Sequence, residues 1–204
     1  MIRLLITFFV LSSCSNIPIS YKDLPSTVYR AAVGYPEIII DQEAYNENRF
    51  SFATVAIGKS KPIIMVLLSI DKDTYTWVDK EGGQLITRNG RIIQTVGLPH
   101  DIEIKFETTR KTYQEGKFSE IVNFNNPLLI NADLSSFTTL EDKIDYLYLD
   151  ELILVNVYSE EVSISDIGWK KENKYFMDIN NREIKTIQFV HPFMKEIKME
   201  FYYK

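Results

Sequence analysis

The two histidines of this sequence, His100 and His191, are its first candidates for metal or acid–base chemistry. Each lies beside a proline, in a segment with the composition of a loop. No cysteine and no second histidine close in the sequence completes a set of metal ligands. We therefore expect ordinary loop histidines and no metal site. The alternative is a Zn²⁺ site made by both histidines with carboxylates, which requires that the fold bring the two together.

Tandem carboxylates are the next candidates, because two carboxyl groups at a fixed separation can hydrolyse a glycosidic bond. The acidic clusters are Asp71/Asp73, Glu115 or Glu120, Glu141/Asp142, Asp150/Glu151 and Glu160/Glu161. Tandem acids at turn positions are usually solvated turn formers. No nucleophile-elbow motif and no glycine-rich phosphate loop occurs, although a Ser/His/Asp triad is recognised only in space. We predict no catalytic residue and no cofactor, with a glycoside hydrolase as the enzymatic alternative.

Aromatic and charged side chains near two expected turns form a third set of candidate functional residues. Trp77 and Trp169 have the ring type that stacks on sugars, but aromatics at alternate strand positions more often belong to the core. Asp79 and Asp178 each precede a turn and are expected to fix it, with Arg91 and Arg182 as their ion-pair partners. The six residues that we name as a surface for a partner or a sugar are Trp77, Asp79, Arg91, Trp169, Asp178 and Arg182.

The only cysteine, Cys14, follows an apolar run at the start of the chain. Arg3 precedes Leu4–Leu11, which spans ~12 Å as a helix and is too short for a hydrocarbon core of ~30 Å. Residues 1–13 therefore read as a signal peptide. A buried N-terminal strand with an inert thiol is the alternative.

The residues Leu11-Ser12-Ser13-Cys14 resemble the lipobox of bacterial lipoproteins. This resemblance implies that Cys14 becomes the first residue of the mature protein and carries diacylglycerol and an amide-linked acyl chain such as palmitate. Ser15 stands where an aspartate would favour retention in the inner membrane. The implied location is the outer membrane, lipid-anchored and facing the periplasm.

The bulk composition fits a single globular domain of modest size. The 204 residues are 45% hydrophobic and carry a net charge of −5, and no basic cluster suits nucleic acid. We divide the chain into a signal peptide (1–13), a lipidated tether with a short helix after Pro25 (14–34) and one all-β domain (35–204). A second short helix is expected after Asp41, which can cap it.

Strand patterns dominate after residue 50. Asn89-Gly90 between β-branched residues predicts a hairpin with a type I′ turn between strands 84–88 and 91–96. The run Ile63–Leu68 predicts a strand buried on both faces. We count about ten strands and predict an all-β fold, an antiparallel meander that closes as a sandwich or a partly open barrel.

A weak internal repeat relates two of these hairpins. A shift of 91 residues places Asn89–Val96 on Asn180–Ile187 and His100 on His191. A duplicated half explains this match, and chance similarity between hairpins is the alternative.

Several sequence blocks resemble the YjbF/GfcB family of bacterial lipoproteins, which are encoded with exopolysaccharide and group 4 capsule secretion genes. The blocks are Phe52-Ala53, Pro62–Leu68, Trp77-Val78-Asp79, Leu85–Leu98, Trp169, Asn173–Asp178, Gln188 and Pro192. Asn181 replaces the usual glycine of the second hairpin, Phe176 stands where the family often has tryptophan, and residues 112–145 show little of the family pattern.

The resemblance implies a non-catalytic component of exopolysaccharide or capsule export. The implied partners are an outer-membrane β-barrel protein and periplasmic proteins of the same export system, with the polysaccharide itself as a further possible partner. An exposed strand edge is the docking surface that we expect. A lipid-anchored polysaccharide-modifying enzyme and a carbohydrate-binding module are the alternatives.

Overall fold

The computed structural model describes Arg30, residues 33–105 and residues 111–204. The expected signal peptide, Cys14 and nearly all of the expected helix after Pro25 lie outside these residues. Gly34–Lys204 form one compact unit, which contains every strand and both large hydrophobic clusters.

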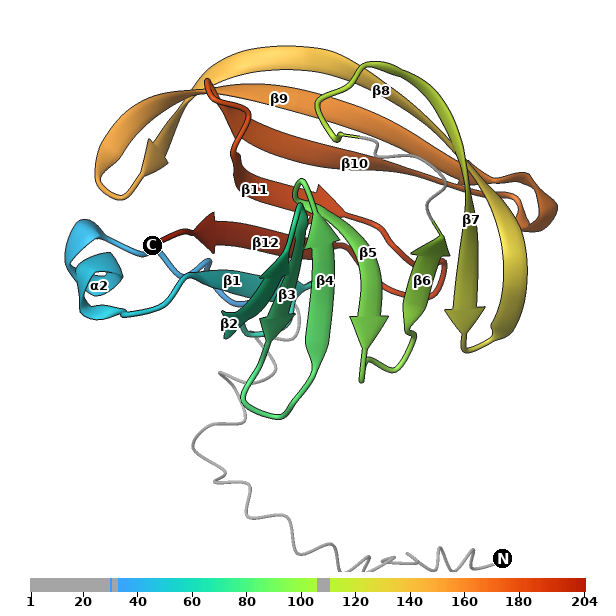
Figure 1. Ribbon diagram of the computed structural model, residues 1–204, viewed down its shortest axis with the longest axis horizontal. Coiled ribbons are helices and arrows are strands. Elements are labelled where there is room, and N and C mark those ends of the chain that lie inside the picture. Colours follow the sequence, from blue (N-terminus) through green and yellow to red (C-terminus); the bar gives the residue numbers. More distant parts are fainter. Residues whose placement is uncertain (1–29, 31–32, 106–110) are drawn as a thin grey trace, which may run out of the picture. The chain divides into compact units, whose positions relative to one another are not determined.

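This unit is a closed ring of twelve antiparallel strands (Figure 1). In chain order the elements are α2 (Gln42–Glu47), β1 (Phe52–Ile57), β2 (Ile63–Asp71), β3 (Thr74–Val78), β4 (Gln84–Arg88), β5 (Arg91–Val96), β6 (Ile102–Lys105), β7 (Gly116–Asn125), β8 (Leu128–Tyr148), β9 (Glu151–Ile164), η1 (Ser165–Ile167), β10 (Trp169–Asp178), β11 (Glu183–Gln188) and β12 (Ile197–Tyr202). Each strand pairs with its neighbours in sequence, and β1 pairs with β12 to close the ring.

The ring confirms the all-β antiparallel meander and selects the barrel over the sandwich. The ring has two strands more than expected. The long strands β7 and β8 occupy the middle of the chain, where the sequence pattern predicted no strand. Closure gives each strand two neighbours, but β7 pairs with β8 only as far as Thr138, so the end of β8 beyond it pairs, among the described strands, with β9 alone and keeps a free edge. Docking of a partner on a strand edge stays a prediction.

The Asn89-Gly90 turn joins β4 and β5 as its sequence predicts. Both residues have positive φ, 48° and 77°, which a type I′ turn requires. The turn also packs on β11, since a methyl group added to Gly90 would lie 3.0 Å from Cβ of Glu183. Glycine is needed here for its conformation and for its lack of a side chain.

Substitution of Gly90 by alanine is expected to lower the unfolding free energy by about 2–4 kcal/mol, because backbone strain adds to an overpacked contact. Gly82→Ala is the matched control. Gly82 has φ +91° with nothing within 4 Å of the added carbon, so strain alone should cost about 1–2 kcal/mol. Urea unfolding of both variants measures the difference, and equal losses would show that the contact with β11 contributes nothing.

The barrel interior is filled by apolar side chains from all parts of the ring. Trp77 of β3 is fully buried, and its Nε1 donates to Oγ1 of Thr87 on β4 at 2.9 Å. Its ring lies 5.4 Å from that of Phe201 on β12. Trp77 therefore links β3 from inside with β12, three strands away round the ring.

The apolar run Ile63–Leu68 is not buried on both faces, and that prediction is wrong. Met65 points into the core and is 3% exposed. The alternate side chains are exposed on the outer face of β2: Ile64 47%, Val66 39%, Leu68 61% and Ile70 57%. Successive side chains of a strand point to opposite faces, and in a single-layered barrel one of those faces is the outside.

The β8–β9 hairpin extends beyond the ring and folds over its outer surface (Figure 1). The register shifts between Leu140 and Asp142, where β8 bends. Beyond the bend, Tyr148 stacks on Tyr202 of β12 at 5.6 Å and its hydroxyl donates to the Phe201 carbonyl at 2.8 Å. A second hydrophobic cluster forms between the hairpin and β12.

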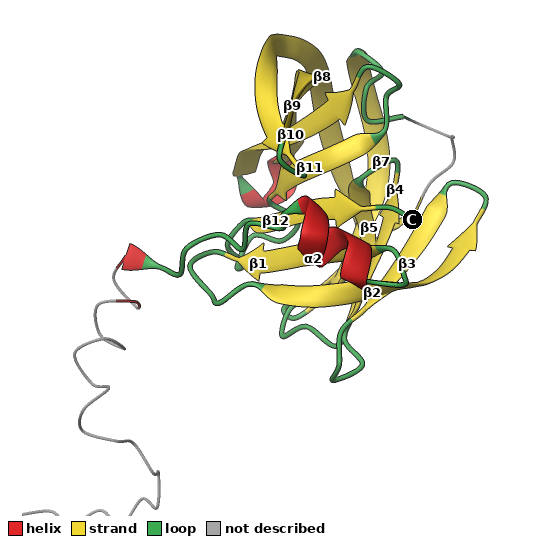
Figure 2. Cartoon of the chain, turned by 90° about the vertical axis from the view of Figure 1, so that its left-hand side faces the viewer, coloured by secondary structure: helices red, strands yellow, loops and turns green. Residues whose placement is uncertain are grey.

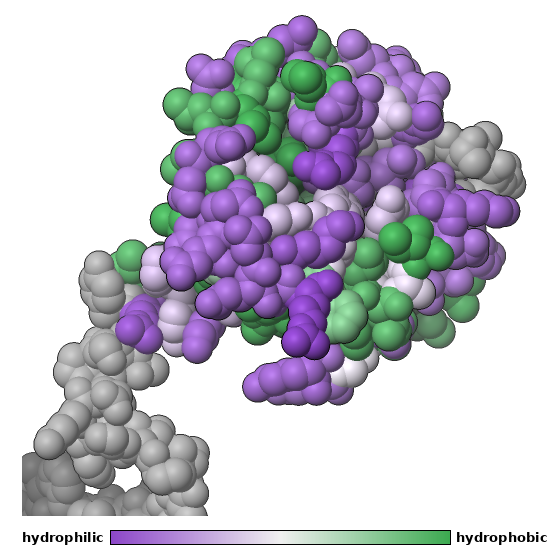
Figure 3. Space-filling model, turned by 60° about the vertical axis from the view of Figure 1, so that its left-hand side comes forward, coloured by the Kyte–Doolittle hydropathy of each residue, from purple (hydrophilic) through white to green (hydrophobic). Residues whose placement is uncertain are grey.

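Apolar side chains gather over this hairpin in the upper part of Figure 3. Leu147 of β8 and Leu152 and Leu154 of β9 are exposed on this hairpin.

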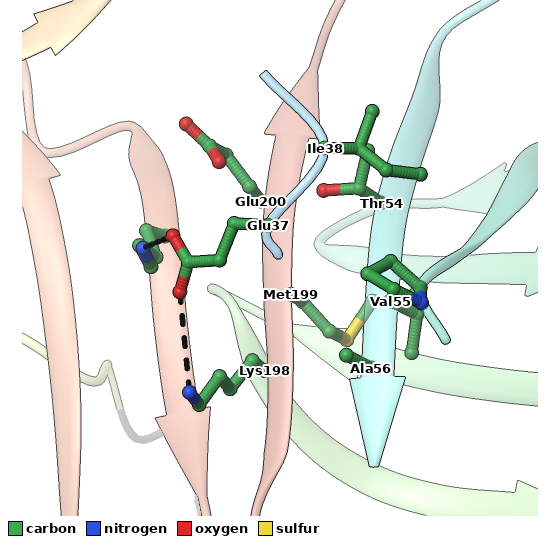
Figure 4. Close-up of a pocket in the computed structure, with 10 residues that line it drawn as sticks. Glu37, Ile38, Thr54, Val55, Ala56, Lys198, Met199 and Glu200 are labelled. Carbon is green, nitrogen blue, oxygen red and sulfur yellow. Dashed lines mark hydrogen bonds and ion pairs between the residues drawn. The ribbon is translucent and has the colours of Figure 1, made fainter. Parts of the chain in front are cut away.

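The segment before β1 lies against the outer face of β11, β12 and β1. Glu37 makes ion pairs with Lys185 at 3.0 Å and Lys198 at 3.9 Å (Figure 4). Helix α2 follows (Figure 2), with Asp41 as its N-cap accepting from the Ala44 amide at 2.7 Å, as expected. The pocket under this segment holds only about 30 Å³, room for a water molecule or so. No helix formed by the described residues is both long and apolar enough to cross a membrane.

Candidate functional site

The two aspartates that were expected to fix turns do so with the same hydrogen bonds. Oδ1 of Asp79 accepts from the amides of Glu81 and Gly83, at 2.7 and 2.9 Å. Oδ1 of Asp178 accepts from the amides of Asn180 and Arg182, both at 2.8 Å. Both carboxylates are committed to the backbone of their own turns.

The expected ion pairs of these aspartates are found only in the second turn. Arg182 lies 3.7 Å from Asp178, with half of its side chain exposed. Arg91 does not pair with Asp79, so that prediction is wrong. Instead Arg91, the first residue of β5, is 4% exposed, and its guanidinium meets acidic side chains of β7 and β9.

Arg91 is the centre of a buried polar network. Its Nη1 contacts Oε2 of Glu120 on β7 at 2.5 Å, and its Nη2 lies 3.5 Å from Oε1 of Glu160 on β9. Burial disfavours the charged guanidinium, but the carboxylates of Glu160 and Glu120 outweigh it and raise the pKa of Arg91. The ion pairs therefore keep a permanent positive charge in the interior.

The same network extends to residues that the family pattern includes. The hydroxyl of Tyr175 donates to Oε2 of Glu160 at 2.6 Å, and Nδ2 of Asn173 donates to the same oxygen at 3.1 Å. Gln188 of β11 accepts from the Ile92 amide at 2.9 Å and donates to the Gly90 carbonyl at 2.8 Å. These bonds tie β5, β9, β10 and β11 together across the barrel.

The network has no room for a substrate. The cavity beside it, lined by Arg91, Asn173 and Gln188 among others, measures about 20 Å³, enough for one water molecule. Two of the tandem acid pairs are placed as follows. Glu160 points inward and its neighbour Glu161 outward, as alternation along a strand requires. Asp150/Glu151 lie exposed at the hairpin tip.

The fold brings the two histidines into contact. The rings of His100 and His191 stack with centroids 4.8 Å apart, and Phe124 of β7 meets His191 edge-on at 4.7 Å. In the ring, β5 and β11 lie six strands apart, the arrangement that a duplicated half would give, and duplication stays a prediction. In the described part of the chain, no group of three or more His, Cys, Asp or Glu side chains is placed to hold a metal.

His191 is neutral and its tautomer is fixed. Its side chain is 1% exposed, and Nδ1 accepts from the Phe193 amide at 3.0 Å, so Nε2 carries the proton. Burial, with a smaller contribution from His100, lowers the pKa of His191 to about 4. Nε2 is buried without a hydrogen-bond partner in the described structure.

A pocket of about 430 Å³ opens beside His191, at the end of the barrel where β9 turns into β10 (right side of Figure 1). Its walls are Phe124, Pro127, Leu128, Leu129, Ile167, Gly168, Trp169, His191, Pro192 and Phe193. Trp169 is half-buried there, and its Nε1 also has no partner among the described residues. Of the six residues named from the sequence, Trp169 is thus the one that lines this larger pocket, whereas Trp77 belongs to the core.

Sequence reasoning missed most of this pocket. Its apolar walls come from the β7–β8 turn, η1 and the β11–β12 loop, three segments far apart in the sequence. Of its residues, the sequence singled out only three. Trp169 was a candidate for stacking on a sugar, His191 a candidate metal ligand, and Pro192 part of the family pattern.

Comparison with known proteins agrees with this architecture. The family model described as "Group 4 capsule polysaccharide lipoprotein gfcB, YjbF" matches residues 26–202. No curated protein matches the sequence. The crystal structure of the hypothetical lipoprotein YmcC from Escherichia coli (K12) is similar, with a TM-score of 0.69, 17% identity and coverage of 91% of this chain and 97% of that one. The match over nearly the whole barrel places this chain in the YjbF family of group 4 capsule polysaccharide lipoproteins.

Proposed function

We propose that this protein is an outer-membrane lipoprotein, facing the periplasm, that serves as a non-catalytic component of capsule or exopolysaccharide export. The observation that carries the proposal is the position of the polar family residues. Inside the closed barrel, Arg91, Asn173 and Tyr175 all contact Glu160, and Gln188 bonds the backbone of Gly90 and Ile92, so these residues hold strands together. Residues with that task serve the scaffold, and the carboxylates of Glu120 and Glu160 are committed to it.

In this proposal the lipid on Cys14 keeps the barrel close to the membrane. A flexible linker of the length of residues 15–34 would have a reach of ~25 Å. Confinement within that distance raises the effective concentration of the barrel near membrane partners without any new contact. An outer-membrane β-barrel protein and periplasmic proteins of the same system are the partners that we infer.

Gene deletion with complementation tests the non-catalytic role. Deletion is expected to abolish or strongly reduce secreted polysaccharide. Variants in which Glu141/Asp142, Asp150/Glu151 or Glu161 become amides should each restore secretion, since these exposed acids are not required. One amide variant that folds normally and still fails to restore secretion would favour the polysaccharide-modifying enzyme.

Anchoring is tested by Cys14→Ser, which is expected to abolish incorporation of labelled palmitate and to move the protein out of the membrane fraction. Two acyl chains or more give stable attachment, and without Cys14 none is attached. Ser15→Asp is the matched variant: it should keep the label but move the protein to the inner-membrane fraction. Labelling that survives Cys14→Ser would remove the anchor from the proposal.

A further inference from the structure

The pocket beside His191 has the size and lining of a ligand site. Its volume of about 430 Å³ lies in the usual range for small-molecule pockets, ~300–1,000 Å³. Aliphatic, aromatic and proline side chains make nearly all of its wall, and no Lys, Arg, Asp or Glu lines it. Leu128 and Phe193 are 73% and 67% exposed, so an apolar part of the wall faces water.

Two hydrogen-bond donors of this wall have no acceptor among the described residues. Nε2 of His191 and Nε1 of Trp169 are both buried, and neither has a partner in the described structure. A buried N–H without an acceptor is costly, so such groups usually meet a partner in the functional state. Both donors are neutral N–H groups, which suit an uncharged oxygen.

These features select among ligand classes. A sugar presents many hydroxyl groups, and a wall with two donors and few acceptors would leave most of them unpaired. A carboxylate or phosphate would enter a neutral apolar pocket without a cation to balance its charge. An apolar chain that carries one uncharged carbonyl oxygen matches both the wall and the donors.

We infer that this pocket binds the acyl chain of a membrane lipid, with the ester carbonyl oxygen accepting from Nε2–H of His191 and Nε1–H of Trp169. Membership of a lipoprotein family places the barrel at a membrane, where acyl esters are the abundant molecules of this chemistry. An acyl chain that enters the pocket displaces the exposed side chains of Leu128 and Phe193 at the pocket mouth. The inference is independent of the export role, since binding is measured on the purified protein.

The test uses the chain from Ser15 to Lys204, which contains the whole barrel, and the fluorescent methyl ester of cis-parinaric acid as the probe. Saturable binding is expected, with the probe displaced by methyl laurate and less effectively by an alkane of the same length. His191→Phe and Trp169→Phe each remove one donor and keep an aromatic ring. Each should weaken binding of the ester about 3- to 10-fold, the effect of one neutral hydrogen bond, and leave the alkane unchanged.

Leu128→Asp and Leu152→Asp form a matched pair, because both leucines are 73% exposed and only Leu128 lines the pocket. Leu128→Asp should weaken the probe by at least 10-fold, whereas Leu152→Asp should not change it. Thermal unfolding checks that both variants fold. Absence of saturable binding, equal effects of the two aspartates, or displacement by a neutral oligosaccharide in place of methyl laurate would each overturn the inference.

Discussion

Replacement of Arg91 by leucine is expected to lower the unfolding free energy by about 3–5 kcal/mol, among the largest effects of any single substitution in this barrel. The guanidinium pairs with both Glu120 and Glu160, which are 8% and 0% exposed. Without it, two carboxylates remain buried with their compensating cation removed. Tyr175 and Asn173 still donate to Glu160, but neutral donors do not cancel its charge.

Arg88→Leu is the control, since Arg88 lies at the other end of the same Asn89-Gly90 turn. Its ion pair with Asp73, at 3.3 Å, is partly exposed and should contribute about 1 kcal/mol or less. The double variant Arg91→Leu, Glu160→Gln should recover part of the loss because one buried charge is removed with the cation. Urea unfolding measures all three. Equal losses for the two arginines would mean that the interior network does not stabilise the fold.

The features that the sequence predicted correctly are local. Strands 84–88 and 91–96 are joined by a turn whose two residues need positive φ, and the conformation of Asn89-Gly90 follows from those residues alone. The cap at Asp41 is equally local. Such features depend on a few neighbouring residues and on no distant contact.

The long strand β8 was missed because its alternation is interrupted. The β7–β8 pairing shifts register between Val122 and Phe124, and the β8–β9 pairing shifts between Leu140 and Asp142. Each shift changes which side chains face inward, so no single period of two runs through β8. The bent end of the hairpin also covers the outer face of β12, which reverses what is buried there.

The partners of the site residues could not be predicted from the sequence, for a different reason. Arg91 meets Glu120 and Glu160, from strands that come close only when the ring closes. The match over a shift of 91 residues pairs His100 with His191, and the fold brings these two histidines into contact. Similarity between two hairpins does not by itself place them side by side, so the topology of the ring decides both pairings.

The stability of the barrel is expected to depend on pH through His191. In the unfolded chain a histidine titrates near 6.5, whereas burial and the nearby His100 lower the pKa of folded His191 to about 4. Between these values the unfolded state binds the proton and the folded state does not, so the unfolding free energy falls as the pH falls. The contribution is fully present above about pH 7 and is lost by pH 4, a difference of about 2–4 kcal/mol.

Comparison with His191→Phe isolates this dependence from other titrating groups. Burial raises the pKa values of Glu183 and Glu200, so these two carboxyls stabilise the fold as the pH falls and oppose the histidine. Both proteins keep them, and the difference in unfolding free energy between the two removes their effect. Relative to the variant, the native barrel should lose about 2–4 kcal/mol between pH 7 and 4 in urea unfolding. A difference that stays constant with pH would mean that His191 titrates alike in both states, and therefore that it is not sealed from water as the fold places it.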